Sequence, residues 1–297
     1  MKLKNIFLTF AAVLVSASLP ALPQFKVLHL ANEQNIVSVT EASRYLLLPV
    51  QDDAPEAKVG VISGNTRVGE LANVRLARER VDYYVPFSLE AFMGKDVKID
   101  VLGMPQGSLC WKELKLSDTF DMANREKYRP LYHHTPAYGW MNDPNGMFYK
   151  DGVYHLYFQH NPYGSTWGNM HWGHSTSTDL VHWEYEGDAL LPDAWGTVFS
   201  GSAVVDKDNT AGFGRDAIVA FYTSAKPTPW GDAQMQSIAY STDGGKTFTK
   251  YAGNPVLTSA ERDFRDPKVF WYAPGKHWVM ILAVGQQMQI FRDLRIS

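Results

Sequence analysis

Residues 142–158 read NDPNGMFYKDGVYHLYF, and this stretch decides the fold. It holds a turn sequence at Asp143, a run of strand-forming residues to Tyr149, a second turn at Asp151 and another run that ends at Phe158. This succession is typical of short antiparallel strands, and almost no helical periodicity occurs in the second half of the chain. We therefore predict that this half is all-β.

The same pattern, closed by an aspartate turn, recurs twice more. The second copy begins near Ser200 and has its aspartate turn at Asp243, equivalent to Asp179 in the first copy; the third copy begins at Asp266. The starting points Asp143, Ser200 and Asp266 are 57 and 66 residues apart, which leaves room for four short strands in each copy. Such units predict a β-propeller, whose blades pack face to face around a central channel.

Innermost strands of successive blades converge on the propeller axis, so we expect Asp143, Ser200 and Asp266 to face one shared cavity. Eight of the nine tryptophans lie in this half of the chain. Aromatic rings stack on the apolar faces of sugars, carboxylates bind sugar hydroxyls, and paired carboxylates are the minimum apparatus for glycoside cleavage. The tryptophans that flank the candidate site are expected to form its walls: Trp140, Trp167 and Trp172.

Composition excludes several other classes of protein. The chain has 28 basic and 31 acidic residues, a net charge of −3. It therefore lacks the excess of positive charge that is typical of nucleic-acid-binding proteins. A hydrophobic fraction of 45% excludes intrinsic disorder. Cys110 is the only cysteine, which rules out an intrachain disulfide and a zinc cluster, and we expect a buried, inert thiol.

The first 21 residues have the layout of a secretory signal peptide. Lys2 and Lys4 precede an apolar stretch from Ile6 to Val15, and small residues follow it. The apolar run is shorter than the roughly 20 residues that a membrane-spanning helix needs. We expect a secreted or periplasmic protein with no membrane span in its mature form.

Residues 22–121 are predicted to form an N-terminal β-sandwich accessory domain, because short β-type runs alternate with turn signals. The expected strands cover residues 44–50, 58–63, 81–87, 96–102 and 110–116. The polar stretch 118–129 is interpreted as a linker. Residues 128–297 then form the propeller domain, of which about three blades are present.

Five motifs occur in order in the second half: WMNDPNG at 140–146, FQHNP at 158–162, Trp167 followed by HWGH at 171–174, FSGS at 199–202 and FRDP at 264–267. This ordered set is very specific and resembles glycoside hydrolase family 32, which contains the invertases, inulinases, levanases and other β-fructosidases. The resemblance covers residues 128–291. The front part is similar, more weakly, to a β-sandwich that precedes the catalytic domain in some bacterial members.

The resemblance implies a retaining glycosidase on a five-bladed propeller, acting on fructan or sucrose without a metal or organic cofactor. Asp143 would be the nucleophile that attacks the anomeric carbon of a fructofuranosyl unit. Asp266, beside Arg265, would hold the fructose hydroxyls and stabilise the transition state. The residues implied in the pocket for the terminal fructose are Asn142, Gln159, Trp167, Phe199 and Ser200.

The chain departs from the family pattern at its end. The family uses a general acid/base, a glutamate followed by cysteine in a later blade, and the repeat spacing places that segment beyond Ser297. About three blades fit the sequence, and Asp293 has no aromatic residue four positions on, whereas Asp179 has Trp183. We therefore expect a C-terminally truncated member that lacks its acid/base glutamate.

Other candidate groups in this half favour structural roles. His171 and His174 are three apart on a predicted strand, so they point to opposite faces and are not expected to share a metal ion. Glu184 and Glu186 could be proposed as a substitute acid, but we expect them on the outer strand of the first blade, away from the axis.

Alternatives to an active β-fructosidase stay open at this point. The chain could be a catalytically inactive remnant, a fructan-binding lectin-like protein, or a five-bladed glycosidase acting on arabinan or xylan. The full motif at 140–146 argues against the last of these. The sequence does not distinguish levan, inulin and sucrose, endo and exo action, or the oligomeric state.

Overall fold

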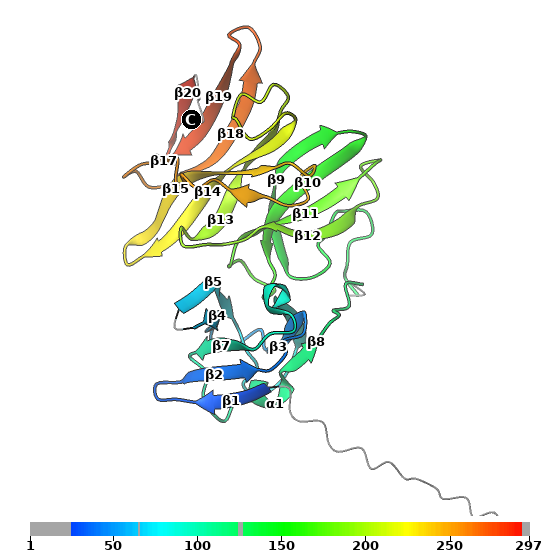
Figure 1. Ribbon diagram of the computed structural model, residues 1–297, viewed down its shortest axis with the longest axis vertical. Helices are drawn as coiled ribbons and strands as arrows, with labels where there is room; N and C mark the ends of the chain where they lie inside the picture. Colours follow the sequence, from blue (N-terminus) through cyan, green and yellow to red (C-terminus); the bar gives the residue numbers. More distant parts are fainter. Residues whose placement is uncertain (1–24, 65, 124–126, 293–297) are drawn as a thin grey trace, which may run out of the picture.

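The structure is a computed structural model that describes residues 25–64, 66–123 and 127–292. It is almost entirely β, and it consists of an N-terminal sandwich and three further sheets above it (Figure 1). The predicted signal peptide at 1–21 lies outside the described residues. Within the described residues, we find no helix with the length and apolar character needed to cross a membrane.

The N-terminal part is a sandwich of two antiparallel sheets. The larger sheet has the strand order β1 (Phe25–His29), β2 (Gln34–Val39), β7 (Val97–Leu102), β4 (Ala57–Ser63) and β5 (Thr66–Val74). The smaller sheet has the order β6 (Tyr83–Ser88), β3 (Tyr45–Val50) and β8 (Lys115–Ser117). Alternate residues of β2, such as Val37 and Val39, are buried in the core that both sheets share, as expected for strands with one covered face.

Four of the five predicted strands of the sandwich coincide with β3, β4, β6 and β7. The prediction at 110–116 is wrong in its first half, because the chain forms a single helical turn, α1 (Cys110–Glu113), before β8. The Leu114 N–H donates to the Cys110 carbonyl at 2.9 Å, which closes this turn and buries the Cys110 thiol. Burial raises the pKa of Cys110 to about 12, so the thiol is inert as expected.

The second half forms three sheets, each beginning with its innermost strand. The first contains β9 (Trp140–Lys150), β10 (Val153–Asn161), β11 (His171–Ser177) and β12 (Glu184–Leu190). The second contains β13 (Thr197–Asp206), β14 (Ala217–Thr228), β15 (Gly231–Ser241), β16 (Thr249–Lys250) and β17 (Leu257–Thr258). The third contains β18 (Phe264–Tyr272), β19 (His277–Val284) and β20 (Gln287–Arg292).

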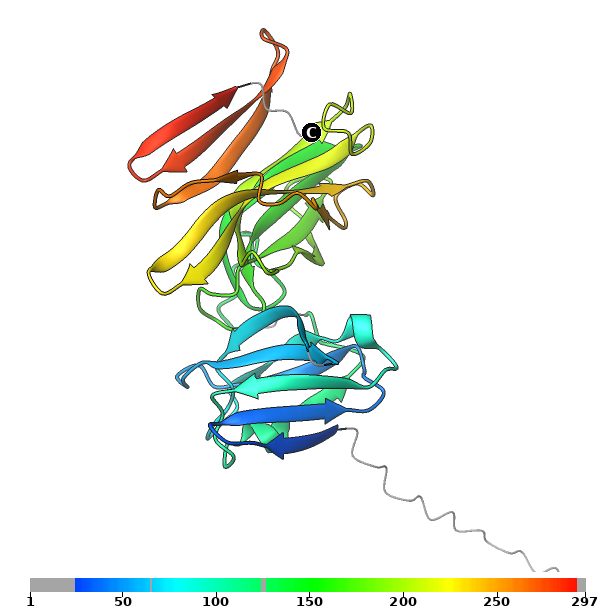
Figure 2. The same ribbon diagram turned by 60° about the vertical axis from the view of Figure 1, so that its left-hand side comes forward.

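These sheets are successive blades of a propeller. Strand β13 contacts both β9 and β18, so the first strands of the three sheets lie side by side (Figure 2). Apolar residues of the first and second blades, including Tyr157 and Tyr222, form one core between them. The predicted all-β architecture, a sandwich followed by about three propeller blades, is confirmed.

The aspartate turns repeat in structure as they do in sequence. Asp179 accepts hydrogen bonds from the Val181 and His182 N–H groups at 2.9 and 2.8 Å. Asp243 accepts from two backbone N–H groups in the equivalent turn of the second blade, each at 3.1 Å. In both turns the serine two residues earlier donates to the aspartate. The repeat inferred from the sequence is therefore a repeat of local hydrogen bonding.

Candidate active site

The innermost strand of the first blade contains a β-bulge at Asp143. Asn142 pairs with Gln159 of β10 and Pro144 pairs with Phe158, which leaves Asp143 as an extra residue without a partner. Its φ of 23° is uncommon for a residue with a side chain. Bulges interrupt the ladder and re-aim the side chain of the extra residue. The Asp143 carboxylate is consequently exposed rather than packed within the sheet.

The second and third blades carry bulges at the equivalent positions. The pairing of β13 with β14 skips Ser200, and the pairing of β18 with β19 skips Asp266 and Pro267. Asp266 also has a positive φ, of 61°. The three residues that the repeat singled out thus occupy the same structural feature in three adjacent innermost strands. This shared feature brings their side chains to one region near the axis.

Ser200 and Asp143 are in direct contact. The Ser200 hydroxyl donates to Asp143 Oδ2 at 2.9 Å and links the second blade to the first. The bulge presses the backbone after Ser200 against β14, since a Cβ placed on Gly201 would lie only 1.9 Å from the Phe221 carbonyl oxygen. Glycine at position 201 is therefore required by the bulge that presents Ser200.

Asp266 lies within electrostatic reach of Asp143. Burial raises the pKa of Asp266, the Arg265 guanidinium opposes this rise, and the negative charge of Asp143 adds to it. Arg265 Nε lies 3.6 Å from Asp266 Oδ2, and the same guanidinium also pairs with Asp263. Two carboxylates with like charge, one of them shifted toward protonation, are an arrangement typical of acid–base and nucleophilic sites.

Aromatic and amide groups border these carboxylates. Trp140 donates its indole N–H to Asn142 Oδ1 at 2.9 Å, one residue before Asp143. Trp167 packs edge-to-face against Phe199 with 5.8 Å between ring centroids, and 56% of Trp167 is exposed. The exposed Trp167 ring, packed on the residue that precedes Ser200, offers a flat apolar face.

Gln159 is held inside the protein by its amide. It is 2% exposed, and its Nε2 donates to the Val198 carbonyl at 2.9 Å, two residues before Ser200. The second blade repeats this contact, because Gln236 donates to the Phe264 carbonyl at 2.7 Å, two residues before Asp266. Each glutamine therefore anchors the innermost strand of the next blade just before its bulge.

Buried hydroxyls that sequence reasoning missed anchor the bulge at Asp266. Thr223 Oγ1 accepts the Asp266 N–H at 3.2 Å and donates to Gln236 Oε1 at 2.9 Å. Ser202 donates to the Pro267 carbonyl at 2.8 Å and accepts the Val269 N–H at 2.9 Å. The available signal was a polar residue inside an apolar strand, as at Thr223 after the run from 217 to 222.

Trp172 does not form a wall of this site, contrary to expectation. Its side chain is completely buried in the core between the first two blades. Trp172 lies on β11, the third strand out from the axis, where a large side chain fills the gap between sheets. Its indole N–H donates to the Phe199 carbonyl at 3.0 Å, so Trp172 holds the backbone next to Ser200 from within the core.

The histidines and outer glutamates lie away from the bulges. His171 pairs with Glu70 of the sandwich at 3.2 Å, whereas His174 contacts His155 at 3.1 Å, so the two side chains have different surroundings. In the described ranges no group of three or more potential metal ligands is found. Glu184 and Glu186 are exposed on β12, the outermost strand, as predicted.

Two family models match this chain. The family model described as glycosyl hydrolases family 32 N-terminal domain matches residues 133–293, more than half of the chain. A domain of unknown function, DUF4980, matches residues 31–132.

The levanase of Bacillus subtilis is 58% identical over 176 residues, 58% of this chain and 25% of that protein. Invertase 1 of Saccharomyces cerevisiae is 48% identical over 179 residues, 57% of this chain and 33% of that protein. The structure of a β-fructofuranosidase from Schwanniomyces occidentalis, complexed with fructosyl-erythritol, matches with a TM-score of 0.53 and 46% identity, covering 59% of this chain and 35% of that one. The chain thus spans about a quarter to a third of the length of these curated relatives.

Proposed function

The chain belongs to glycosyl hydrolases family 32, and we propose that it cleaves β-fructofuranosyl linkages in fructans, such as levan and inulin, or in sucrose. The observation that carries the proposal is the pair of bulged aspartates, Asp143 and Asp266, on innermost strands that flank β13. Relatives named levanase and invertase support the choice of a fructose-containing substrate.

In this proposal Asp143 is the nucleophile of a retaining mechanism. One of its carboxylate oxygens bonds to the anomeric carbon of fructose as the bond from that carbon to the leaving oxygen breaks. Water then attacks the same carbon, the Asp143 carboxylate is released, and the proton that the water loses returns to the group that protonated the leaving oxygen. The leaving oxygen takes a proton from a general acid, a role that we assign to none of the described residues around Asp143.

The neighbouring residues receive binding roles. Asp266 and Arg265 hold fructose hydroxyls and stabilise the charge that develops on the sugar ring. Ser200 orients the Asp143 carboxylate through their 2.9 Å hydrogen bond. The walls of the fructose pocket are formed by Trp140, Asn142, Trp167 and Phe199, with Gln159 supporting them from the interior.

We also propose that the protein acts outside the cytoplasm. The layout of residues 1–21 supports export. Relatives described as extracellular exo-inulinases support it further.

Fructose release from levan, inulin and sucrose tests the proposal, with the Asp143→Asn variant measured in parallel. We expect release by the wild-type protein and none by the variant, while thermal melts of the two proteins coincide. Saturable fructan binding that survives Asp143→Asn, with no product from either protein, would instead favour the lectin-like alternative. Release of arabinose without fructose would overturn the assignment of substrate.

A further inference from the structure

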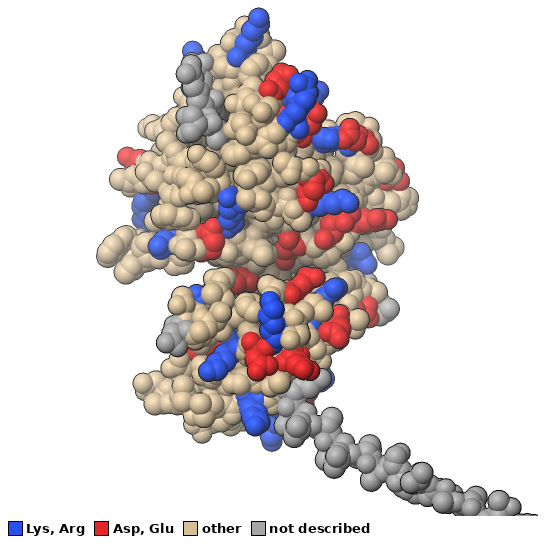
Figure 3. Space-filling view, in the orientation of Figure 1, with Lys and Arg blue, Asp and Glu red and all other residues tan. Residues whose placement is uncertain are grey.

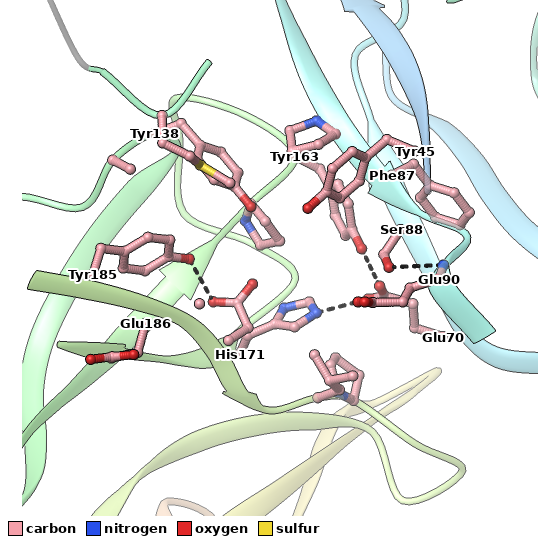
Figure 4. A pocket seen from close by; sticks show the side chains of 18 of the residues that line it. Tyr45, Glu70, Phe87, Ser88, Glu90, Tyr138, Tyr163, His171, Tyr185 and Glu186 are labelled. Carbon is pink, nitrogen blue, oxygen red and sulfur yellow. Dashed lines mark hydrogen bonds and ion pairs between the residues drawn. The ribbon is translucent and has the colours of Figure 1, made fainter. Parts of the chain in front are cut away.

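A cavity of about 1020 Å³ lies between the sandwich and the first blade (Figure 4). Strands β5 and β6 and the short helix η1 (Glu90–Phe92) line one side, and β11 and β12 line the other. None of Asp143, Ser200 and Asp266 lines this interdomain cleft. Strand β12 is at the opposite edge of the blade from β9, so the cleft is separate from the candidate active site.

Direct contacts fix the two sides of the cleft relative to each other. Glu70 of β5 pairs with His171 of β11 at 3.2 Å and accepts a hydrogen bond from the Tyr163 hydroxyl (Figure 4). Next to this pair, the Asn169 amide bonds both the N–H and the carbonyl of Asn73, each at 2.8 Å. The cleft is therefore a preformed site at a domain boundary, where ligand pockets are common.

The lining of the cleft disfavours anionic ligands. Among the described residues, five carboxylate residues and one arginine line it, so phosphate or nucleotide groups would meet mostly like charge. In Figure 3, acidic side chains lie on both sides of the narrow region between the sandwich and the propeller, with several basic side chains among them. Seven aromatic residues also line the cleft, including Trp183, Tyr138 and Tyr185. Aromatic rings together with carboxylate acceptors suit a neutral ligand rich in hydroxyl groups.

The carboxylates of the cleft differ in whether they already have hydrogen-bond partners within the protein. Asp188 accepts from His160 at 2.6 Å and from the Tyr185 hydroxyl at 3.3 Å, so it belongs to the internal framework. Glu184 and Glu186 turn to the other face of β12, where Glu186 accepts a hydrogen bond from Thr176 at 2.9 Å. Glu90 of η1 lines the cleft, is exposed, and lies 3.6 Å from Arg44. An exposed carboxylate such as Glu90 can accept hydrogen bonds from a ligand at little structural cost.

We propose that the interdomain cleft is a second carbohydrate-binding site, which holds a segment of a polymeric fructan while another part of the chain occupies the Asp143 site. The identity of the sugar rests on the proposed function. Three strand spacings separate β9 from β12, about 14 Å, so only a chain of several sugars can reach both sites. Linking two sites through one polymer raises its affinity above that of either site alone.

Calorimetric titration of the full chain with levan, inulin and free fructose tests this site. The cleft variants are Trp183→Ala and Glu90→Gln. The matched control is Glu79→Gln, an exposed glutamate outside the cleft. We expect each cleft variant to bind the polymers about tenfold or more weakly, with unchanged fructose affinity and unchanged melting temperature.

Two outcomes would contradict the proposed second binding site. In the first, both cleft variants bind the polymers with the wild-type affinity; in the second, the wild-type protein binds the polymers no more tightly than it binds fructose. Failure of the proposed function has a different signature, namely no fructose release and no fructose binding by the wild-type protein. If the Trp183→Ala variant melts at a lower temperature, the Glu90→Gln variant decides, because this side chain is exposed and glutamine is isosteric with glutamate.

Discussion

The Ser200 hydroxyl donates a 2.9 Å hydrogen bond to Asp143 Oδ2, joining two residues 57 positions apart. The contact exists because both residues occupy bulges in neighbouring innermost strands. A hydrogen bond to a charged acceptor contributes about 1.5–3 kcal/mol. The nucleophile proposed for this enzyme is therefore oriented by a residue from the next blade.

Replacing Ser200 by alanine should slow catalysis without unfolding the protein. Loss of the bond to Asp143 is expected to lower the kcat for fructose release about tenfold to a hundredfold. The measurement is the rate of fructose release from sucrose, together with a melting curve. Ser259→Ala, at an exposed serine, serves as the control and should keep the wild-type rate. A wild-type kcat in Ser200→Ala would show that this hydroxyl does not orient the nucleophile.

The Asp143→Asn variant should lower the pKa of Asp266. Burial raises the pKa of Asp266, Arg265 opposes the rise, and the charge of Asp143 contributes to it. Removing that charge removes one of the raising influences, so Asp266 should ionise at lower pH. Carbon-13 chemical shifts of the carboxyl group, followed against pH, measure the change. The control variant Asp151→Asn, at an exposed position in a turn, should leave the titration of Asp266 unaltered. An unchanged Asp266 titration in Asp143→Asn would mean that the two carboxylates do not interact.

Thr223→Val should destabilise the third blade. The substitution conserves shape but leaves the Asp266 N–H and Gln236 Oε1 without their partner in the interior. We expect a loss of about 1–3 kcal/mol in the free energy of unfolding, measured by urea denaturation. Thr223→Ser retains the hydroxyl and should recover most of the loss. Equal stability of the valine and wild-type proteins would contradict this role.

The contact between Glu70 and His171 should make stability depend on pH. Burial alone lowers the pKa of His171, but the Glu70 charge and hydrogen bond outweigh it, and the net shift is upward. A raised pKa stabilises the folded protein below the unfolded value of about 6.5, and this contribution is lost as pH rises through the folded pKa.

The advantage of the wild-type protein over Glu70→Gln should therefore be largest near pH 6 and shrink toward pH 8 and above. Chemical denaturation at several pH values measures this difference. Glu79→Gln is again the control and should show a constant difference. A Glu70→Gln deficit that is the same at every pH would refute the electrostatic origin of the contact.

Gly201→Ala should strain the second blade. The added Cβ would lie 1.9 Å from the Phe221 carbonyl oxygen, a backbone atom that cannot move without distorting β14. We expect destabilisation at the upper end of overpacking effects, about 3 kcal/mol. The comparison is with Gly107→Ala, where an added Cβ would have no atom within 4 Å beyond its chain neighbours. Urea unfolding of the two variants should separate them clearly.

Local sequence signals predicted much of the fold. The turn at Asp151, the strands on either side and the aspartate turns at Asp179 and Asp243 depend on residues close in the chain, and the structure contains them all. The turn expected at Asp143 is wrong, because Asp143 forms a bulge inside the single strand β9. The error at residues 110–116 has a similar local origin. A single helical turn that buries Cys110 is too short to produce a periodic pattern.

The sequence by itself determined that the chain is all-β, that three equivalent positions begin its blades, and which family its motifs resemble, because turns and strand alternation are local properties. Only the tertiary structure decided that these positions are bulges, that Trp172 is buried beneath Phe199, and that Thr223 and Ser202 hold the third blade. Bulges depend on the register between strands, and burial depends on which blades pack together. Both are set by contacts between residues far apart in the chain, so no local pattern could predict them.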